Sequence, residues 1–253
     1  MITRFKMAGL HLLGSGVIVG LFMCMVYFIW YPYPYYIFHS VTNATKLVVS
    51  VDLILGPLLT FVVFNTVKPI KELKRDLSII ILVQVLALSW GIYITHSVRP
   101  IFAVYFNGEI HSITKVSIDE SGYDLSVKEP GIFQFPELVY IERFSADEYK
   151  TMVLKHMSGE VLGIVLQTHL YKNISDAAKK DMALRGLSES QLTANEDNKQ
   201  KLTDFLASNK IKFDDVLFFP ISAGPYNSVV VIDKKTMKVF DMLDVYVKNS
   251  TEY

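Results

Sequence analysis

The chain has 253 residues, with 25 basic and 25 acidic side chains, so its formal net charge is zero. It contains no basic stripe interleaved with aromatic residues, and we therefore expect no nucleic-acid partner. Its one cysteine, Cys24, excludes an intramolecular disulfide. Charge is also unevenly distributed, because no Asp, Glu, Lys or Arg occurs from Met7 to Thr45.

Three apolar runs of nearly equal length occupy the N-terminal third. A hydrocarbon core about 30 Å thick needs roughly 20 helical residues, and the runs predict three transmembrane helices at about 8–30, 47–65 and 77–95. The first run is longer than the apolar region of a signal peptide and lacks a small-residue cleavage site. It ends in the aromatic segment Trp30–Tyr36, which is typical of a membrane-interface belt. We therefore expect an uncleaved anchor that contacts the lipid bilayer.

The basic residues predict the orientation of these helices. Arg4, Lys6 and the basic loop 68–75 would lie on one side, and positive charge stays cytoplasmic. The N-terminus would then be cytoplasmic and everything after the third helix extracytoplasmic. We expect a multi-pass protein of a bacterial inner membrane, with a transmembrane domain at 1–97 and a periplasmic domain at 98–253.

The periplasmic part is long enough for one globular domain with its own core. From Ser97 onward it has 18 basic and 22 acidic residues. Its patterns predict an α+β domain with antiparallel strands at both ends and helices between them. The turn Asn107-Gly108 predicts a hairpin, and Ser145 with Glu148 predicts a capped helix start. The predicted strands are 101–106, 109–116, 216–219, 228–233 and 237–243, and the predicted helices are 145–157, 175–186 and 188–209. The polar stretch 186–201 predicts weak order.

Asp52 is the first candidate functional residue, because a carboxylate inside a membrane segment is costly unless it is paired or hydrated. It could serve a function, form a specific pair, or reach water near the helix end. Arg99, just beyond the third helix, is a possible cationic partner. Gly56 and Pro57 predict a bend in the second helix, because proline removes a backbone hydrogen bond.

Small and polar residues mark other possible helix contacts. Gly16 and Gly20 form a GxxxG pattern, which lets helices approach closely. The partner could be another span of this chain or a helix of another protein. Gln84 in the third span could hydrogen-bond a neighbouring helix in either setting.

We expect no cofactor, no metal and no catalysis. The six histidines have no common ligand spacing, and the sequence lacks H-E-x-x-H, C-x-x-C, G-x-S-x-G and phosphate-loop patterns. An intramembrane enzyme using Asp52 would need a second ionisable group at the same depth, and neither the first nor the third span shows one.

Several segments together resemble type IV pilin accessory proteins of the TfpX/TfpZ type. The most specific part is the pattern Asp52, Gly56, Pro57 and Thr60. The others are Arg4–Lys6, Trp30–Pro32, Arg99–Pro100, Leu217–Pro220 and Val230–Asp233. The resemblance implies an inner-membrane protein that helps a cognate pilin become stable or assembled, without a known active site. It is silent on about 171–212.

A pilin is a single-span helix with a globular head before it polymerises. A helical bundle with an outer domain could hold both parts, so we expect an accessory or chaperone-like factor whose partner is that pilin. The alternative is a membrane-anchored sensor or regulator with a ligand-binding periplasmic domain. Its sign would be a deep pocket with converging polar groups.

Overall fold

The computed structural model describes residues 2–39, 41–222, 228–245 and 247. The chain divides into two compact units. The helical bundle comprises Met1–Pro32 and Ser40–Val98, and the sheet domain comprises Tyr33–His39 and Arg99–Tyr253. The sheet domain therefore takes a short segment from the middle of the helical sequence as well as the whole C-terminal part.

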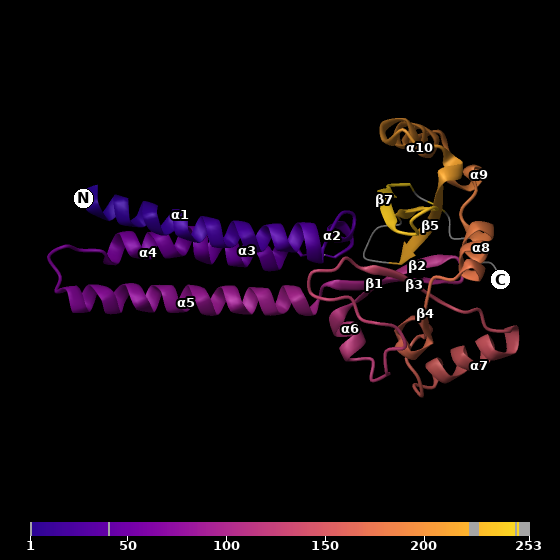
Figure 1. Cartoon of the computed structure of the whole chain (residues 1–253), viewed down its shortest axis with the longest axis horizontal. Helices are drawn as coiled ribbons and strands as arrows, with labels where there is room; N and C mark the ends of the chain where they lie inside the picture. The colour runs from indigo at the N-terminus through magenta and orange to yellow at the C-terminus, as the bar shows by residue number, and fades with distance from the viewer. Residues whose placement is uncertain (1, 40, 223–227, 246, 248–253) are drawn as a thin grey trace. The chain divides into compact units, whose positions relative to one another are not determined.

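The helical bundle consists of two long helices with an interrupted helix between them. Figure 1 shows the interrupted helix alongside both long ones, with the N-terminus and the α4–α5 connection at the same end of the bundle. This places Arg4, Lys6 and the basic loop at one end. The elements are α1 (Ile2–Met25), the π turn η1 (Val26–Trp30), α3 (Thr42–Ser50), the π turn η2 (Val51–Leu55), α4 (Gly56–Val63) and α5 (Ile70–Ser97).

The prediction of three membrane-length helices is corrected to two within the described residues. Ile2–Trp30 and Ile70–Ser97 are long and apolar enough to cross a membrane, which is compatible with membrane anchoring. The apolar part of the middle helix, Val48–Val63, is shorter. Polar residues up to Lys46 occupy its first turns, and the backbone becomes extended at Phe64.

The middle helix changes its hydrogen-bonding pattern just before Gly56-Pro57. The five residues of η2 form a π turn, and Pro57 lies in the first turn of α4. Proline has no backbone N–H to donate, and π turns often occur at such interruptions. The structure thus shows a π turn before Gly56-Pro57, and the predicted bend of the helix stays a prediction.

The aromatic segment, which the sequence predicted as a membrane-interface belt, has both buried and exposed rings. Trp30 and Tyr31 are buried in the helical bundle, where the Tyr31 hydroxyl donates to the Thr95 carbonyl at 2.8 Å. Tyr35 lies in α2 (Tyr35–Phe38) and is buried in a core of the sheet domain. Only Tyr33 and Tyr36 of the segment's tyrosines are exposed. Three of the five rings therefore pack inside the protein, and the interface belt stays a prediction.

The sheet domain is built on one seven-stranded sheet in the order β4-β3-β1-β2-β5-β6-β7. The predicted antiparallel arrangement is incomplete, because β1 pairs with β3 and β2 with β5 in parallel. β3 and β4 were not predicted, and both lie in the middle of the domain's sequence. The strands are β1 (Pro100–Phe106), β2 (Glu109–Thr114), β3 (Glu137–Ile141), β4 (Tyr171–Asn173), β5 (Val216–Ser222), β6 (Val229–Asp233) and β7 (Val239–Leu243).

Local signals in the sequence identified the domain's turns and helix starts well. Asn107 and Gly108 both have positive φ, as the tight turn between β1 and β2 requires. Ser145 and Glu148 form the predicted capping box at the start of α7. The helices are α6 (Lys115–Asp119), α7 (Ala146–Met157), α8 (Asp176–Arg185), α9 (Glu189–Leu192) and α10 (Glu196–Asn209), and short 3-10 turns lie at η3 (Ile164–Leu166), η4 (Thr168–Leu170) and η5 (Phe213–Asp215).

Side chains alternate between the two faces of the central strand β1. Ala103 and Tyr105 join a core with Met182 of α8, while Phe102 and Val104 join another core. The Tyr105 hydroxyl donates to Asp181 at 2.8 Å and so ties α8 to the sheet. Every residue of β1 is buried, as expected for a central strand covered on both faces.

The prediction of weak order at 186–201 is wrong. Ser188 and Gln191 form a capping box at α9, and Leu192 is fully buried. Leu192 and Leu202 pack with Val231 of β6 in a third core. The polar composition reflects the solvent-facing side of these helices, and two leucines are enough to anchor them.

Candidate functional site

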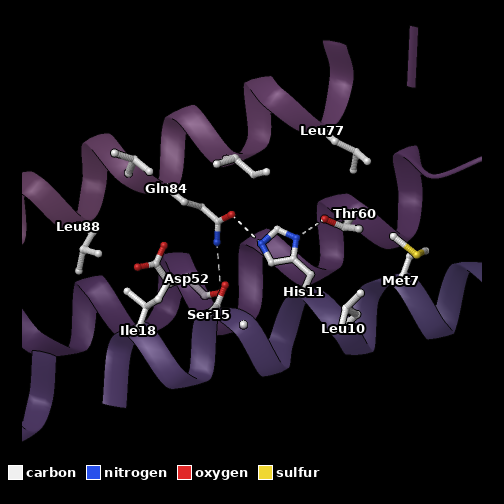
Figure 2. A pocket seen from close by; sticks show the side chains of 13 residues that line it. Met7, Leu10, His11, Ser15, Ile18, Asp52, Thr60, Leu77, Gln84 and Leu88 are labelled. Atoms are coloured by element: carbon white, nitrogen blue, oxygen red, sulfur yellow. Dashed lines mark hydrogen bonds between the residues drawn. The ribbon is translucent and has the colours of Figure 1, made fainter. Parts of the chain in front are cut away.

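The helical bundle contains an open cavity of about 370 Å³. Figure 2 shows Leu77, Gln84 and Leu88 on one side of it and Leu10, Ser15 and Ile18 on the other. The long helices α1 and α5 supply these walls, and both pack mainly on the middle helix. The middle helix contributes Asp52 and Thr60 to the cavity. We call this cavity the bundle groove, with apolar walls and a polar floor.

A chain of hydrogen bonds crosses the floor and joins all three helices (Figure 2). The His11 ring lies 2.5 Å from Thr60 Oγ1 through Nδ1 and 2.7 Å from Gln84 Oε1 through Nε2. The Gln84 amide nitrogen donates to the Asp52 backbone carbonyl at 3.3 Å. An amide oxygen only accepts, so His11 Nε2–H is the donor to Gln84 and the Thr60 hydroxyl donates to Nδ1. A single tautomer of neutral His11 is therefore compatible with both hydrogen bonds of its ring.

Asp52 is the exception on this floor. Its side chain is 4% exposed, yet Oδ1 accepts no hydrogen bond from the described residues. A buried polar atom without a partner costs about 1–3 kcal/mol. The groove therefore contains one unused acceptor at its polar floor.

Gly56 has a clear structural role beside this network. A Cβ added there would lie 2.2 Å from Gln84 Nε2, so only glycine lets the Gln84 amide cross the floor. Gly91 makes the other close approach, because an added Cβ would lie 2.2 Å from Val48 Cγ2. Pro57 is buried next to Gly56.

Gly16 and Gly20 are not the tight contacts of the bundle. A Cβ added at either position meets nothing within 4 Å in the described residues. Close packing of these glycines against this chain's own spans is therefore not observed. Their use by a helix of another protein stays a prediction.

Arg99 belongs to the sheet domain, at the start of β1. Its guanidinium donates to the backbone carbonyls of Pro130 and Gly131, each at 3.2 Å. These bonds secure the loop before β3. An ion pair with Asp52 would join the two units, and it stays a prediction.

Sequence reasoning placed Asp52, Gly56, Thr60 and Gln84 in the spans but missed His11. The available signal was that His11 is a polar ring in a segment without charges. Ser15, one turn later on the same helix face, also lines the groove. Recognising the site needed the helix pairing that brings α1 against α4.

The sheet domain has a second cavity, of about 280 Å³, between the β1–β2 hairpin and α7. Asn107, Glu109, His111 and His156 supply its polar lining. Burial lowers the pKa of His111 to about 4, so the ring is neutral at pH 7 and its 3.8 Å approach to Glu109 is not an ion pair. Burial also raises the pKa of Glu109. Within the described part of the chain, no group of three or more His, Cys, Asp or Glu could hold a metal ion.

Comparisons with known proteins identify the family. The family described as "Fimbrial assembly protein FimB" matches residues 1–38. A Dichelobacter nodosus protein named "Fimbrial assembly protein, serogroups C1 and C2" is 34% identical over 113 residues, which are 45% of this chain and 86% of that protein. The chain belongs to the fimbrial assembly protein family.

Longer relatives in this family extend the similarity along the whole chain. Two Dichelobacter nodosus proteins, named fimbrial assembly protein of serogroup I and of serogroup E1, are 28% and 27% identical over 248 residues. Both alignments cover 95% of this chain and 94% of the relative. No solved structure matches the chain. The resemblance to pilus-related proteins is thereby confirmed at the level of the family.

Proposed function

We propose that this protein is a membrane-embedded accessory factor that stabilises a cognate type IV pilin or assists its assembly into pili. The observation that carries the proposal is membership of the fimbrial assembly protein family. Under this proposal the residues of the bundle groove bind and position a partner, and they do not catalyse a reaction.

The proposed placement is in a bacterial inner membrane. Two long apolar helices with exposed leucine and isoleucine side chains support it. The N-terminus, near which Arg4 and Lys6 lie in the sequence, is at the same end of the bundle as the α4–α5 connection (Figure 1), so this end would be cytoplasmic. The sheet domain would then be periplasmic. A periplasm-dependent reporter enzyme fused after Tyr253 should be active, and one fused at Lys71 should be inactive.

The functional test is deletion of the gene in a piliated strain, followed by complementation. We expect pilin protein and surface pili to fall while pilin messenger RNA stays constant, because an accessory factor acts on the folded protein. The intact gene should restore both. Unchanged pilin and unchanged pili in the deletion strain would refute the proposal.

The second candidate is a membrane-anchored sensor that binds a ligand in the sheet domain. The cavity lined by Glu109, His111 and His156 favours it, because several polar groups converge there. A sensor that regulates pilin expression would change the messenger RNA as well as the protein. Measuring both in the same deletion strain separates the two functions.

A further inference from the structure

The bundle groove combines apolar walls with polar side chains on its floor. Its walls are apolar and outward-facing, since Leu10, Ile18, Ile81 and Val85 are 63%, 54%, 54% and 53% exposed. Its floor nevertheless holds a connected set of polar side chains. The hydrogen bonds of His11, Thr60 and Gln84 join the three helices of the bundle, so these groups already have a use within the chain.

The polar groups of the floor satisfy one another with a single exception. His11 uses both ring nitrogens, and Gln84 uses both its oxygen and its amide nitrogen. Among the polar side chains of the floor that the structure describes, Asp52 has a buried oxygen, Oδ1, that accepts no hydrogen bond. Asp52 lines the groove, so a molecule that enters between α1 and α5 can bring a hydrogen-bond donor to its carboxylate.

The chemistry of the surroundings restricts what can enter. At membrane depth a protein segment must satisfy its own backbone hydrogen bonds, so a spanning segment of a partner is a helix. The apolar walls require that helix to be apolar over most of its surface. The free acceptor requires one donating group, such as a hydroxyl, an amide or an amine, at the level of Asp52.

We propose that the bundle groove receives the single membrane helix of the cognate pilin, and that a hydrogen-bond-donating group of this helix pairs with the carboxylate of Asp52. The pilin as occupant rests on the proposed function. The groove then acts as a temporary fourth-helix site, which covers the pilin's apolar helix before polymerisation.

Site-specific photo-crosslinking tests the groove in the intact protein in membranes. A photoreactive residue replaces Ile18 or Ile81 in the groove walls, and matched controls carry it at Leu13 or Leu86, which are exposed on the same helices outside the groove. The probe is the epitope-tagged major pilin of the same strain. We expect at least fivefold more pilin adduct from the groove positions than from their controls.

Two results would overturn the groove as the docking site. One is equal pilin adduct at groove and control positions. The other is a groove that yields only lipid adducts or adducts with a second copy of this chain. Loss of pilin in the deletion strain together with either result would leave the proposed function intact and remove only the groove. No effect of the deletion would refute the proposed function itself.

The role of Asp52 is tested by two substitutions with pilin adduct measured per molecule of accessory protein. Asp52→Asn keeps an acceptor oxygen, and Asp52→Leu removes it. We expect Asp52→Leu to reduce the adduct from Ile81 about tenfold, and Asp52→Asn to stay within about twofold of the unsubstituted protein. Normalising to the accessory protein corrects for any loss of folded chain. An Asp52→Leu protein with undiminished adduct would overturn the pairing.

Discussion

Both units bury apolar side chains, such as Phe219 in the sheet domain and Trp30 in the helical bundle, and the two differ in how many large apolar side chains they expose. Most of the bundle's large apolar side chains are exposed, including Leu13 and Leu86. The sheet domain follows the rule for water-soluble proteins, in which burial of apolar surface drives folding. The helical bundle also has a buried apolar core, but it departs from this rule in the many large apolar side chains that it exposes.

Under the proposed membrane placement, the two units are stabilised by different forces. Apolar helices gain little from burying leucines against one another when lipid tails are equally apolar, so small residues and interhelical hydrogen bonds decide their packing. The close approaches at Gly56 and Gly91 and the hydrogen bonds of His11 and Gln84 fit that description. Matched substitutions in the two units test whether they are stabilised in different ways.

The largest expected effect on stability comes from creating a cavity in the core of the sheet domain. Phe219 is fully buried, and its ring meets that of Tyr105 edge to face at a centroid distance of 5.3 Å. Phe219→Ala should lower the free energy of unfolding by about 3–5 kcal/mol. Resistance of the full chain to proteolysis in detergent, titrated with urea, measures the loss.

The control for this change is Leu184→Ala in α8, because Leu184 is 86% exposed. Its effect should stay within about 0.5 kcal/mol. If truncation at Leu184 cost as much as truncation at Phe219, the sheet domain would not be stabilised by its apolar core, and the comparison would fail.

The next effect is a dependence of the sheet domain's stability on pH. Burial lowers the pKa values of His39 and His111 to about 4, from the ordinary 6.5. Below pH 6.5 the unfolded chain binds protons at these histidines and the folded chain does not, so stability falls as the pH drops from 6.5 toward 4. The loss is at most about 1.4 kcal/mol per pH unit for each histidine.

Urea midpoints of the full chain at several pH values measure this loss. His39→Gln and His111→Gln should each flatten the dependence between pH 6.5 and 4. His169→Gln, at an exposed position, serves as the control and should leave the curve unchanged. A curve that is equally steep in all variants would show that other groups control the acid sensitivity.

A smaller effect on stability is expected when a side chain is added at Gly56, which lies close to Gln84 in the bundle. In Gly56→Ala the new methyl group would lie 2.2 Å from Gln84 Nε2. Gln84 must therefore move, which breaks its bonds to His11 and to the Asp52 carbonyl. Interhelical hydrogen bonds in membranes contribute about 0.6–1.7 kcal/mol, so membrane abundance and heat resistance of the variant should fall moderately.

Much of the sheet domain could be predicted from local sequence signals, because turns and caps depend on a few neighbouring residues. Asn107-Gly108 and Ser145 with Glu148 are examples. The short strands β3 and β4 could not be predicted, since their pairing with β1 depends on contacts distant in sequence. The same limit applies to the bundle groove. Asp52 and Gln84 stood out as polar residues in apolar runs, but only the packing of the helices brings His11 to Thr60 and Gln84.

The smallest effect on this protein itself is expected at the GxxxG pattern. Gly16 and Gly20 have open space where a side chain would extend, so Gly20→Ile should leave the membrane abundance of the chain unchanged. In this respect it is the matched control for Gly56→Ala, which replaces a glycine in close contact.

Pilin capture by the Gly20→Ile protein then measures a separate property, the use of the glycine face by a partner helix. A normal amount of accessory protein with reduced pilin capture and fewer pili would show that a partner helix uses the glycine face. A reduced amount of accessory protein would instead mean that Gly20 packs inside the chain, contrary to the open space around it. A normal amount of accessory protein with normal pilin capture would leave the bundle groove as the docking surface and assign no contact to the glycines.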